Sequence, residues 1–114
     1  MRILFSLILF FTATAVMAEG CDKPYKVEIP DGATATKEDM VTTQKAVKAY
    51  MAEADVYLGC LEEEQSKLAT AILSEEALAE ASAKWSRRHN AMVDEMHGVG
   101  DEFNAAVRAY KAAQ

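Results

Sequence analysis

Lys37–Leu73, KEDMVTTQKAVKAYMAEADVYLGCLEEEQSKLATAIL, is the stretch that decides the fold of this chain of 114 residues. Its apolar side chains recur at steps of three, four and seven, the spacing that gathers them on one face of a helix. The residues of this face are Met40, Val47, Tyr50, Ala54, Tyr57, Leu61 and Leu68, widened by Met51, Leu58 and Ile72. Thr36 precedes the stretch as a helix cap, with Asp39 placed to complete a capping box. We therefore predict one amphipathic helix over residues 37–73.

A second helix follows after a very short connection. Ser74 can cap it, and Glu75 and Glu76 suit its first turn. Its apolar residues alternate in steps of three and four, which is typical of the seam of a helix pair. They are Leu78, Ala81, Trp85, His89, Met92, Met96, Val99, Phe103, Ala106 and Tyr110. We predict a helix over 75–112, with a break between Gly98 and Asp101 as the open alternative.

These two helices give the fold class. Because the connection is too short for any other arrangement, they must pack antiparallel. The prediction is an all-α protein, a coiled-coil-like helical hairpin over residues 37–114. Two helices alone bury limited apolar area, so dimerisation into a four-helix bundle stays open.

The first 18 residues have the layout of a secretory signal peptide. Arg2 supplies the positive charge, an apolar run follows, and small residues lead up to Ala18. The run is shorter than the about 20 residues that span a bilayer. We expect cleavage after Ala18 and a periplasmic or secreted protein that meets the membrane only through this cleaved segment. Attachment of a lipid to Cys21 is the alternative.

The charge of the chain is acidic, with a formal net value of −6. Cleavage after Ala18 would remove Arg2 and no acidic residue, which shifts the net charge to −7. Nucleic-acid phosphates select for basic faces. Nucleic acid is therefore not an expected partner.

Residues 19–36 are predicted to form an extended arm. This segment holds both prolines of the chain, which argues against a helix. Tyr25, Val27 and Ile29 alternate with polar residues, so they share one apolar face of an extended strip. A turn is expected over Ile29–Gly32, where Pro30 suits the second position.

Cys21 and Cys60 are the two cysteines of the chain. In an oxidising compartment two cysteines are most simply paired in one disulfide, although free thiols or an intermolecular bond stay open. Cys60 lies about 35 Å along the first helix, so the arm must double back along that helix to reach it. Small residues beside Cys60 suggest the path: Ala46, Ala49 and Val56 form a flank on which the arm could lie.

Several motifs of the chain resemble a family of small exported helical proteins of proteobacteria to which no activity is assigned. They are Cys21-x-x-Pro24, Pro30-Asp31-Gly32, Val47-x-x-Tyr50, Tyr57-x-x-Cys60-Leu61 and Phe103-Asn104-x-x-Val107. The resemblance covers the expected mature chain and implies export, a helical build and paired cysteines. Gly98 and Gly100 depart from the family's pattern.

The candidate chemistry of the chain is sparse. His89 with Met92 and Met96 could suit copper, and Asp94 with His97 has the one-turn spacing of a metal-ligand pair. The preferred interpretation is that the methionines pack in the core, that His89 is a polar member of the seam, and that Asp94 and His97 are surface residues. Ser82 and Ser86 lie near His89, but a helix surface offers no pocket or oxyanion hole. Lys84, Arg87 and Arg88 flank Trp85 as a basic cluster, read as solvated charge.

No catalytic, cofactor-binding or metal-binding residue is therefore predicted, and no cofactor. We expect a non-enzymatic helical binding or interaction protein of the periplasm, an envelope accessory or a chaperone-like adaptor, with a protein partner that the sequence does not identify. The alternative is a metal- or haem-binding helical bundle formed on dimerisation through His89, His97 and the methionines.

Overall fold

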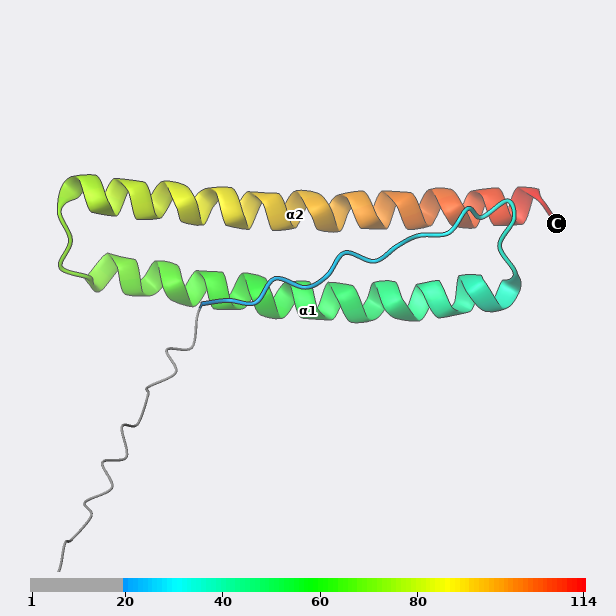
Figure 1. Cartoon of the computed structure of the whole chain (residues 1–114), viewed down its shortest axis with the longest axis horizontal. Helices are drawn as coiled ribbons and strands as arrows, with labels where there is room; N and C mark the ends of the chain where they lie inside the picture. Colours follow the sequence, from blue (N-terminus) through cyan, green and yellow to red (C-terminus); the bar gives the residue numbers. More distant parts are fainter. Residues whose placement is uncertain (1–19) are drawn as a thin grey trace, which may run out of the picture.

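The computed structural model describes residues 20–114, which form an antiparallel hairpin of two helices (Figure 1). α1 spans Lys37–Thr70 and α2 spans Glu75–Ala112, so each helix is about 50 to 57 Å long. No strand is found in this part of the chain, and the predicted all-α hairpin is confirmed. Neither helix contains a stretch long and apolar enough to cross a membrane. The predicted signal peptide, residues 1–18, lies outside the described residues.

The two ends of α1 have different outcomes. Its start is as predicted, because the amide of Asp39 donates to Oγ1 of Thr36 at 3.0 Å and the Asp39 carboxylate accepts from the amide of Thr36 at 2.9 Å. Its end is at Thr70, so the predicted helix over 37–73 is three residues too long. Ala71 is extended, and the chain needs the residues up to Ser74 to reverse direction before α2. Ile72, expected in the apolar stripe, is fully exposed as a result.

α2 begins as predicted and runs without a break. The amide of Ala77 donates to Oγ of Ser74 at 3.1 Å, which caps the helix. Gly98 and Gly100 lie within the continuous helix, so the alternative of a break there is wrong. Its apolar residues hold one phase on both sides of the two glycines and pack against α1. This packing outweighs the cost of about 1 kcal/mol that each glycine adds.

The core is a seam between the two helices. Leu61, Met92 and Val99 are its largest fully buried side chains. Tyr50 and Ala54 are buried with them. Most of the predicted stripe of α1 lies in this seam, whereas Leu78 at the start of α2 is exposed. The apolar side chains are therefore less buried near residues 71–74, the loop that connects the two helices.

The arm crosses from one helix to the other. It starts over α1, beside Cys60, and ends near the C-terminal part of α2 before turning into α1 (Figure 1). Val27 and Ile29 pack against the core seam, as their alternation predicts. Tyr25 departs from that pattern and is 96% exposed.

The arm doubles back from Cys60 toward the start of α1, as predicted, but it does not lie on the predicted flank of α1. Ala46, Ala49 and Val56, the flank expected to receive it, are all exposed. Two ion pairs tie the arm to α2 instead, Lys23 to Glu95 at 3.3 Å and Lys26 to Glu102 at 3.4 Å. Val27 and Ile29 are partly buried against the core that both helices form, which gives them more apolar contact than the surface of one helix would.

The turn that connects the arm to α1 lies two residues beyond the predicted one. The carbonyl of Asp31 accepts from the amides of Thr34 and Ala35 at 3.2 and 3.0 Å, and its carboxylate accepts from the amide of Ala33 at 3.0 Å. The side chain of Asp31 thus shapes the turn, as aspartate commonly does. Gly32 within it is buried against α2.

Candidate functional site

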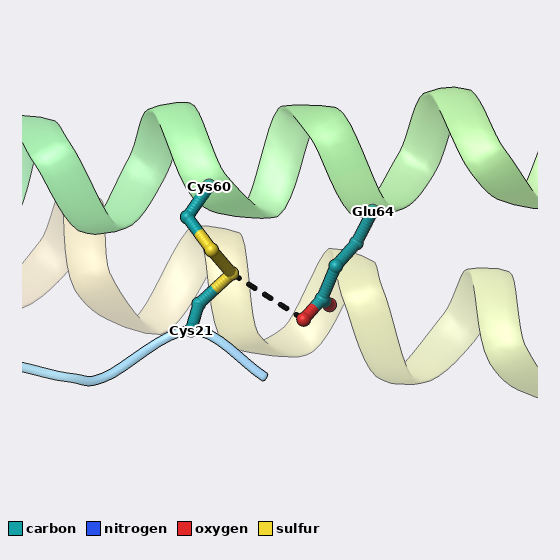
Figure 2. Close-up of side chains that lie close together, drawn as sticks. All are labelled: Cys21, Cys60 and Glu64. Atoms are coloured by element: carbon teal, nitrogen blue, oxygen red, sulfur yellow. Dashed lines mark hydrogen bonds between the residues drawn. A yellow bond between two sulfur atoms is a disulfide. The ribbon is translucent and has the colours of Figure 1, made fainter. Parts of the chain in front are cut away.

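The disulfide between Cys21 and Cys60 fixes the start of the arm on α1. The two Cα atoms lie 5.6 Å apart, and the bond closes a loop of 39 residues. Figure 2 shows Cys21 reaching up from the arm to Cys60 on the helix. The arm is therefore held at both ends, by the disulfide at one and by the entry into α1 at the other.

Glu64 lies one turn beyond Cys60 and faces the disulfide (Figure 2). Its Oε1 is 3.3 Å from Sγ of Cys21. Because a disulfide sulfur carries no hydrogen, this is a contact between sulfur and oxygen, and it could become a hydrogen bond only in the reduced chain. The other oxygen of Glu64 is paired with Nη1 of Arg88 at 2.8 Å. Arg88 thus joins α2 to the point where the arm is attached.

The surroundings of Arg88 change the interpretation of the basic cluster. Its guanidinium lies 6.0 Å from the ring centroid of Tyr57 and is half-buried with Glu64. Trp85, one turn away, donates its indole N–H to the backbone carbonyl of Leu61. Arg88 and Trp85 therefore hold the two helices together, and of the predicted basic cluster only Lys84 and Arg87 are exposed.

The residues considered for metal or haem binding do not converge. His89 stacks on Trp85 with ring centroids 4.9 Å apart. Met92 is fully buried in the core, while Asp94 and His97 are exposed. Within residues 20–114, Cys21, Cys60 and Glu64 are the group whose ligand atoms lie close enough for a metal. Since both sulfurs are bonded to each other, no thiolate is available to bind one in this state.

Tyr50 of α1 and Glu95 of α2 lie close to each other, next to Lys23 of the arm. Tyr50 is 2% exposed, and its hydroxyl faces the carboxylate of Glu95 without a hydrogen bond of ordinary geometry. Burial raises the pKa of Tyr50 to about 12, and the negative charge of Glu95 adds to the effect. Lys23 of the arm approaches the same carboxylate. The arm therefore brings a compensating positive charge to a carboxylate that lies against the core.

An open groove runs along the start of the arm. It has a volume of about 460 Å³, and its walls are mostly apolar. The arm contributes Asp22, Lys23, Pro24 and Tyr25, and α1 contributes Ala52, Glu53 and Val56. Tyr25 and Val56 are 96% and 74% exposed, so this groove displays the two large apolar side chains of the arm and α1 that are most exposed.

This groove was not predicted from the sequence. The alternation of Tyr25 with Val27 and Ile29 places all three on one buried face, and Val56 was assigned to the flank under the arm. Both residues are exposed because they line the open side of the groove between the start of the arm and α1. The one feature of the sequence that could have indicated this groove is an aromatic residue, Tyr25, next to Pro24 in a segment predicted to be extended.

Comparisons with models of protein families, with curated proteins and with solved structures find no match to this chain.

Proposed function

We propose that this chain is an exported periplasmic interaction protein that binds another protein of the cell envelope through the groove beside Tyr25 and Val56. The observation that carries the proposal is the exposure of these two side chains in one mostly apolar groove. Isolated exposed apolar residues are ordinary on protein surfaces, but an apolar groove is a common form of binding site. Aromatic residues are also enriched at the centres of protein interfaces.

The rigidity of the groove supports the proposal. One wall belongs to α1, and the other is held by the disulfide at Cys21 and by the ion pair between Lys23 and Glu95. A partner would meet a surface that is already ordered, so binding would lose little conformational entropy on this side. The disulfide is also what an exported chain acquires in an oxidising compartment.

The chemistry of the groove indicates the kind of segment that fits. Its lining includes Pro24, Tyr25 and Val56, together with Lys23 and Glu53, which carry opposite charges. An apolar or aromatic side chain with a polar backbone around it would match this surface. We therefore expect an exposed peptide segment of an envelope protein as the partner and no small charged ligand.

Site-specific photo-crosslinking in living cells tests the proposal. A photoreactive residue at position 25 should give a discrete crosslinked product, and the same residue at Asn90, exposed on α2, should not. In the Val56→Ser variant the product from position 25 should fall at least tenfold while the protein level stays constant. The proposal is wrong if positions 25 and 90 give the same products, or if Val56→Ser leaves the product unchanged.

The alternative of a metal- or haem-binding bundle has no observation in its favour among the described residues. It needs a second copy of the chain to bring His89, His97 and the methionines to a shared ligand. His89 stacks against Trp85, and His97 is exposed.

A further inference from the structure

The hairpin has two long faces, and the arm covers one of them (Figure 1). Cys60 and Glu102 contact the arm from α1 and α2. Nine residues, about two and a half turns, separate Met51 from Cys60 and Val93 from Glu102, so Met51 and Val93 lie on the opposite sides of their helices. We call the surface that they mark the open face.

The part of the open face that belongs to α2 is uncharged over most of its length. Helical rotation places a continuous set of residues there, between the start of the helix and its last turns. They are Leu78, Ser82, Trp85, Ser86, His89, Val93, Met96, Gly100, Phe103, Asn104 and Val107. Every Asp, Glu, Lys and Arg of α2 between Leu78 and Val107 falls outside this set. A solvated helix face is normally charged, so this uncharged strip indicates a covered surface.

Apolar side chains on this face are only partly covered by the hairpin. Met51 and Leu58 on α1, and Met96 and Phe103 on α2, pack against the core seam but are not fully buried. A groove of about 390 Å³ opens on the same face between the start of α1 and the end of α2. It is lined by Met40, Val41, Gln44, Phe103, Val107 and Tyr110, among others.

Gly100 lies in the middle of the uncharged strip and has no role within the hairpin. A β-carbon at this position would meet nothing within 4 Å, and the helix is regular there. A glycine inside a helix costs about 1 kcal/mol relative to alanine. The same holds for Gly59 and Gly98, and of these three helical glycines Gly100 is the one that lies in the uncharged strip. A glycine on a helix surface does allow a second backbone to approach closely.

We propose that the open face binds a second copy of this chain, with α2 antiparallel to α2 of the other copy, to form a four-helix bundle that leaves both arms outside. The inference is independent of the arm groove. The net charge of −6 opposes the close approach of two copies of this chain, and the uncharged strip of α2 is a surface on which that repulsion is smallest. An interface around a twofold axis presents the same patch on both sides, so this strip meets its own copy.

The spacing along the strip fits an antiparallel pairing of this kind. Ser86, Val93, Gly100 and Val107 follow one another at steps of seven and therefore lie on one line along α2. When α2 pairs antiparallel with α2 of the second copy, Val93 of one copy can lie opposite Gly100 of the other, and Ser86 opposite Val107. Each larger side chain then meets a smaller one, and the twofold axis repeats both pairs.

The oligomeric state of the protein purified from the periplasm tests this proposal. Sedimentation equilibrium between about 1 and 500 μM should give the mass of a dimer at the upper end for the wild type. Gly100→Leu blocks the close approach and Val93→Lys puts a charge into the strip, so each should weaken the dimer at least tenfold. Gly59→Leu and Ala105→Lys introduce the same two side chains at exposed positions outside the strip and should leave the dimer intact.

Two results would overturn the proposal. One is a monomer for the wild type at every concentration, and the other is a dimer that Gly100→Leu and Val93→Lys leave unchanged. Circular dichroism of each variant shows whether the helices are retained. If Val93→Lys loses its helical signal, Gly100→Leu alone decides, because its added side chain meets no atom of the same chain near the position of the β-carbon.

Discussion

Gly32 of the arm lies directly against the backbone of Ala106 in α2, and no β-carbon fits between them. A β-carbon on Gly32 would overlap the carbonyl group of Ala106, which cannot give way without bending the helix. We expect Gly32→Ala to displace the turn and to lower the free energy of unfolding by about 1 to 3 kcal/mol, the usual cost of overpacking. Urea denaturation followed by circular dichroism measures this change.

The matched control is Gly59→Ala in α1. Gly59 is exposed, and a β-carbon there would meet nothing within 4 Å. The same substitution should therefore raise the free energy of unfolding, by up to about 1 kcal/mol, because alanine favours a helix more than glycine does. If the two variants shift stability in the same direction, the contact with Ala106 does not hold the turn.

The disulfide should contribute a large share of the stability of so small a protein. It closes a loop of 39 residues, for which the loss of chain entropy in the unfolded state gives about 4 kcal/mol. A reducing agent should therefore lower the free energy of unfolding by about this amount. The double variant Cys21→Ser, Cys60→Ser is the control, because it should have the lower stability with or without reductant. Equal stability of oxidised and reduced wild type would contradict the expectation.

The helices of this protein were predictable because their signals are local. Thr36 and Asp39 form their capping box within four residues, and the hydroxyl of Ser74 accepts from the amide of Ala77, three residues on, to cap α2. The pairing of Cys21 with Cys60 followed from there being two cysteines and an expected export signal. The break considered at Gly98 and Gly100 failed because packing on both sides outweighs local propensity.

The path of the arm was not predictable, because it depends on contacts between residues far apart in the sequence. The pairing of Lys23 with Glu95 and the fit of Gly32 against Ala106 exist only after the two helices have been placed side by side. No local pattern distinguishes the groove between two helices from the flank of one. The candidate groove was missed for the same reason, since the exposure of Tyr25 follows from that path.

The buried hydroxyl of Tyr50 should make stability depend on pH in the alkaline range. Its pKa rises from the ordinary tyrosine value of 10.0 to about 12 in the fold, first by burial and then through Glu95. The folded chain thus keeps this proton longer than the unfolded chain. The stability that the fold gains from this raised pKa is fully present below pH 10 and is lost as the pH rises through 12. We expect Tyr50→Phe to lose less stability than the wild type between pH 10 and pH 12.

At neutral pH the same substitution should have little cost. The hydroxyl of Tyr50 makes no hydrogen bond of ordinary geometry, so its removal should change the free energy of unfolding by no more than about 1 kcal/mol and can raise it. Denaturation curves at pH 7 and at alkaline pH provide both comparisons. Tyr25→Phe is the control, since it retains Tyr50 and should follow the wild type. A loss of several kcal/mol at pH 7 would mean that the hydroxyl has a strong partner.

Alanine substitutions of Ile72 and Leu61 test where α1 and its buried face end. The apolar period of the sequence places both in one stripe, but Ile72 is fully exposed in the loop after α1, whereas Leu61 is fully buried. Leu61→Ala should lower the free energy of unfolding by about 2 to 5 kcal/mol, the range for a large core side chain. Ile72→Ala should change it by less than about 0.5 kcal/mol, as for other surface sites. A cost of more than about 2 kcal/mol for Ile72→Ala, measured by urea denaturation, would show that α1 continues beyond Thr70 and that Ile72 packs against a partner.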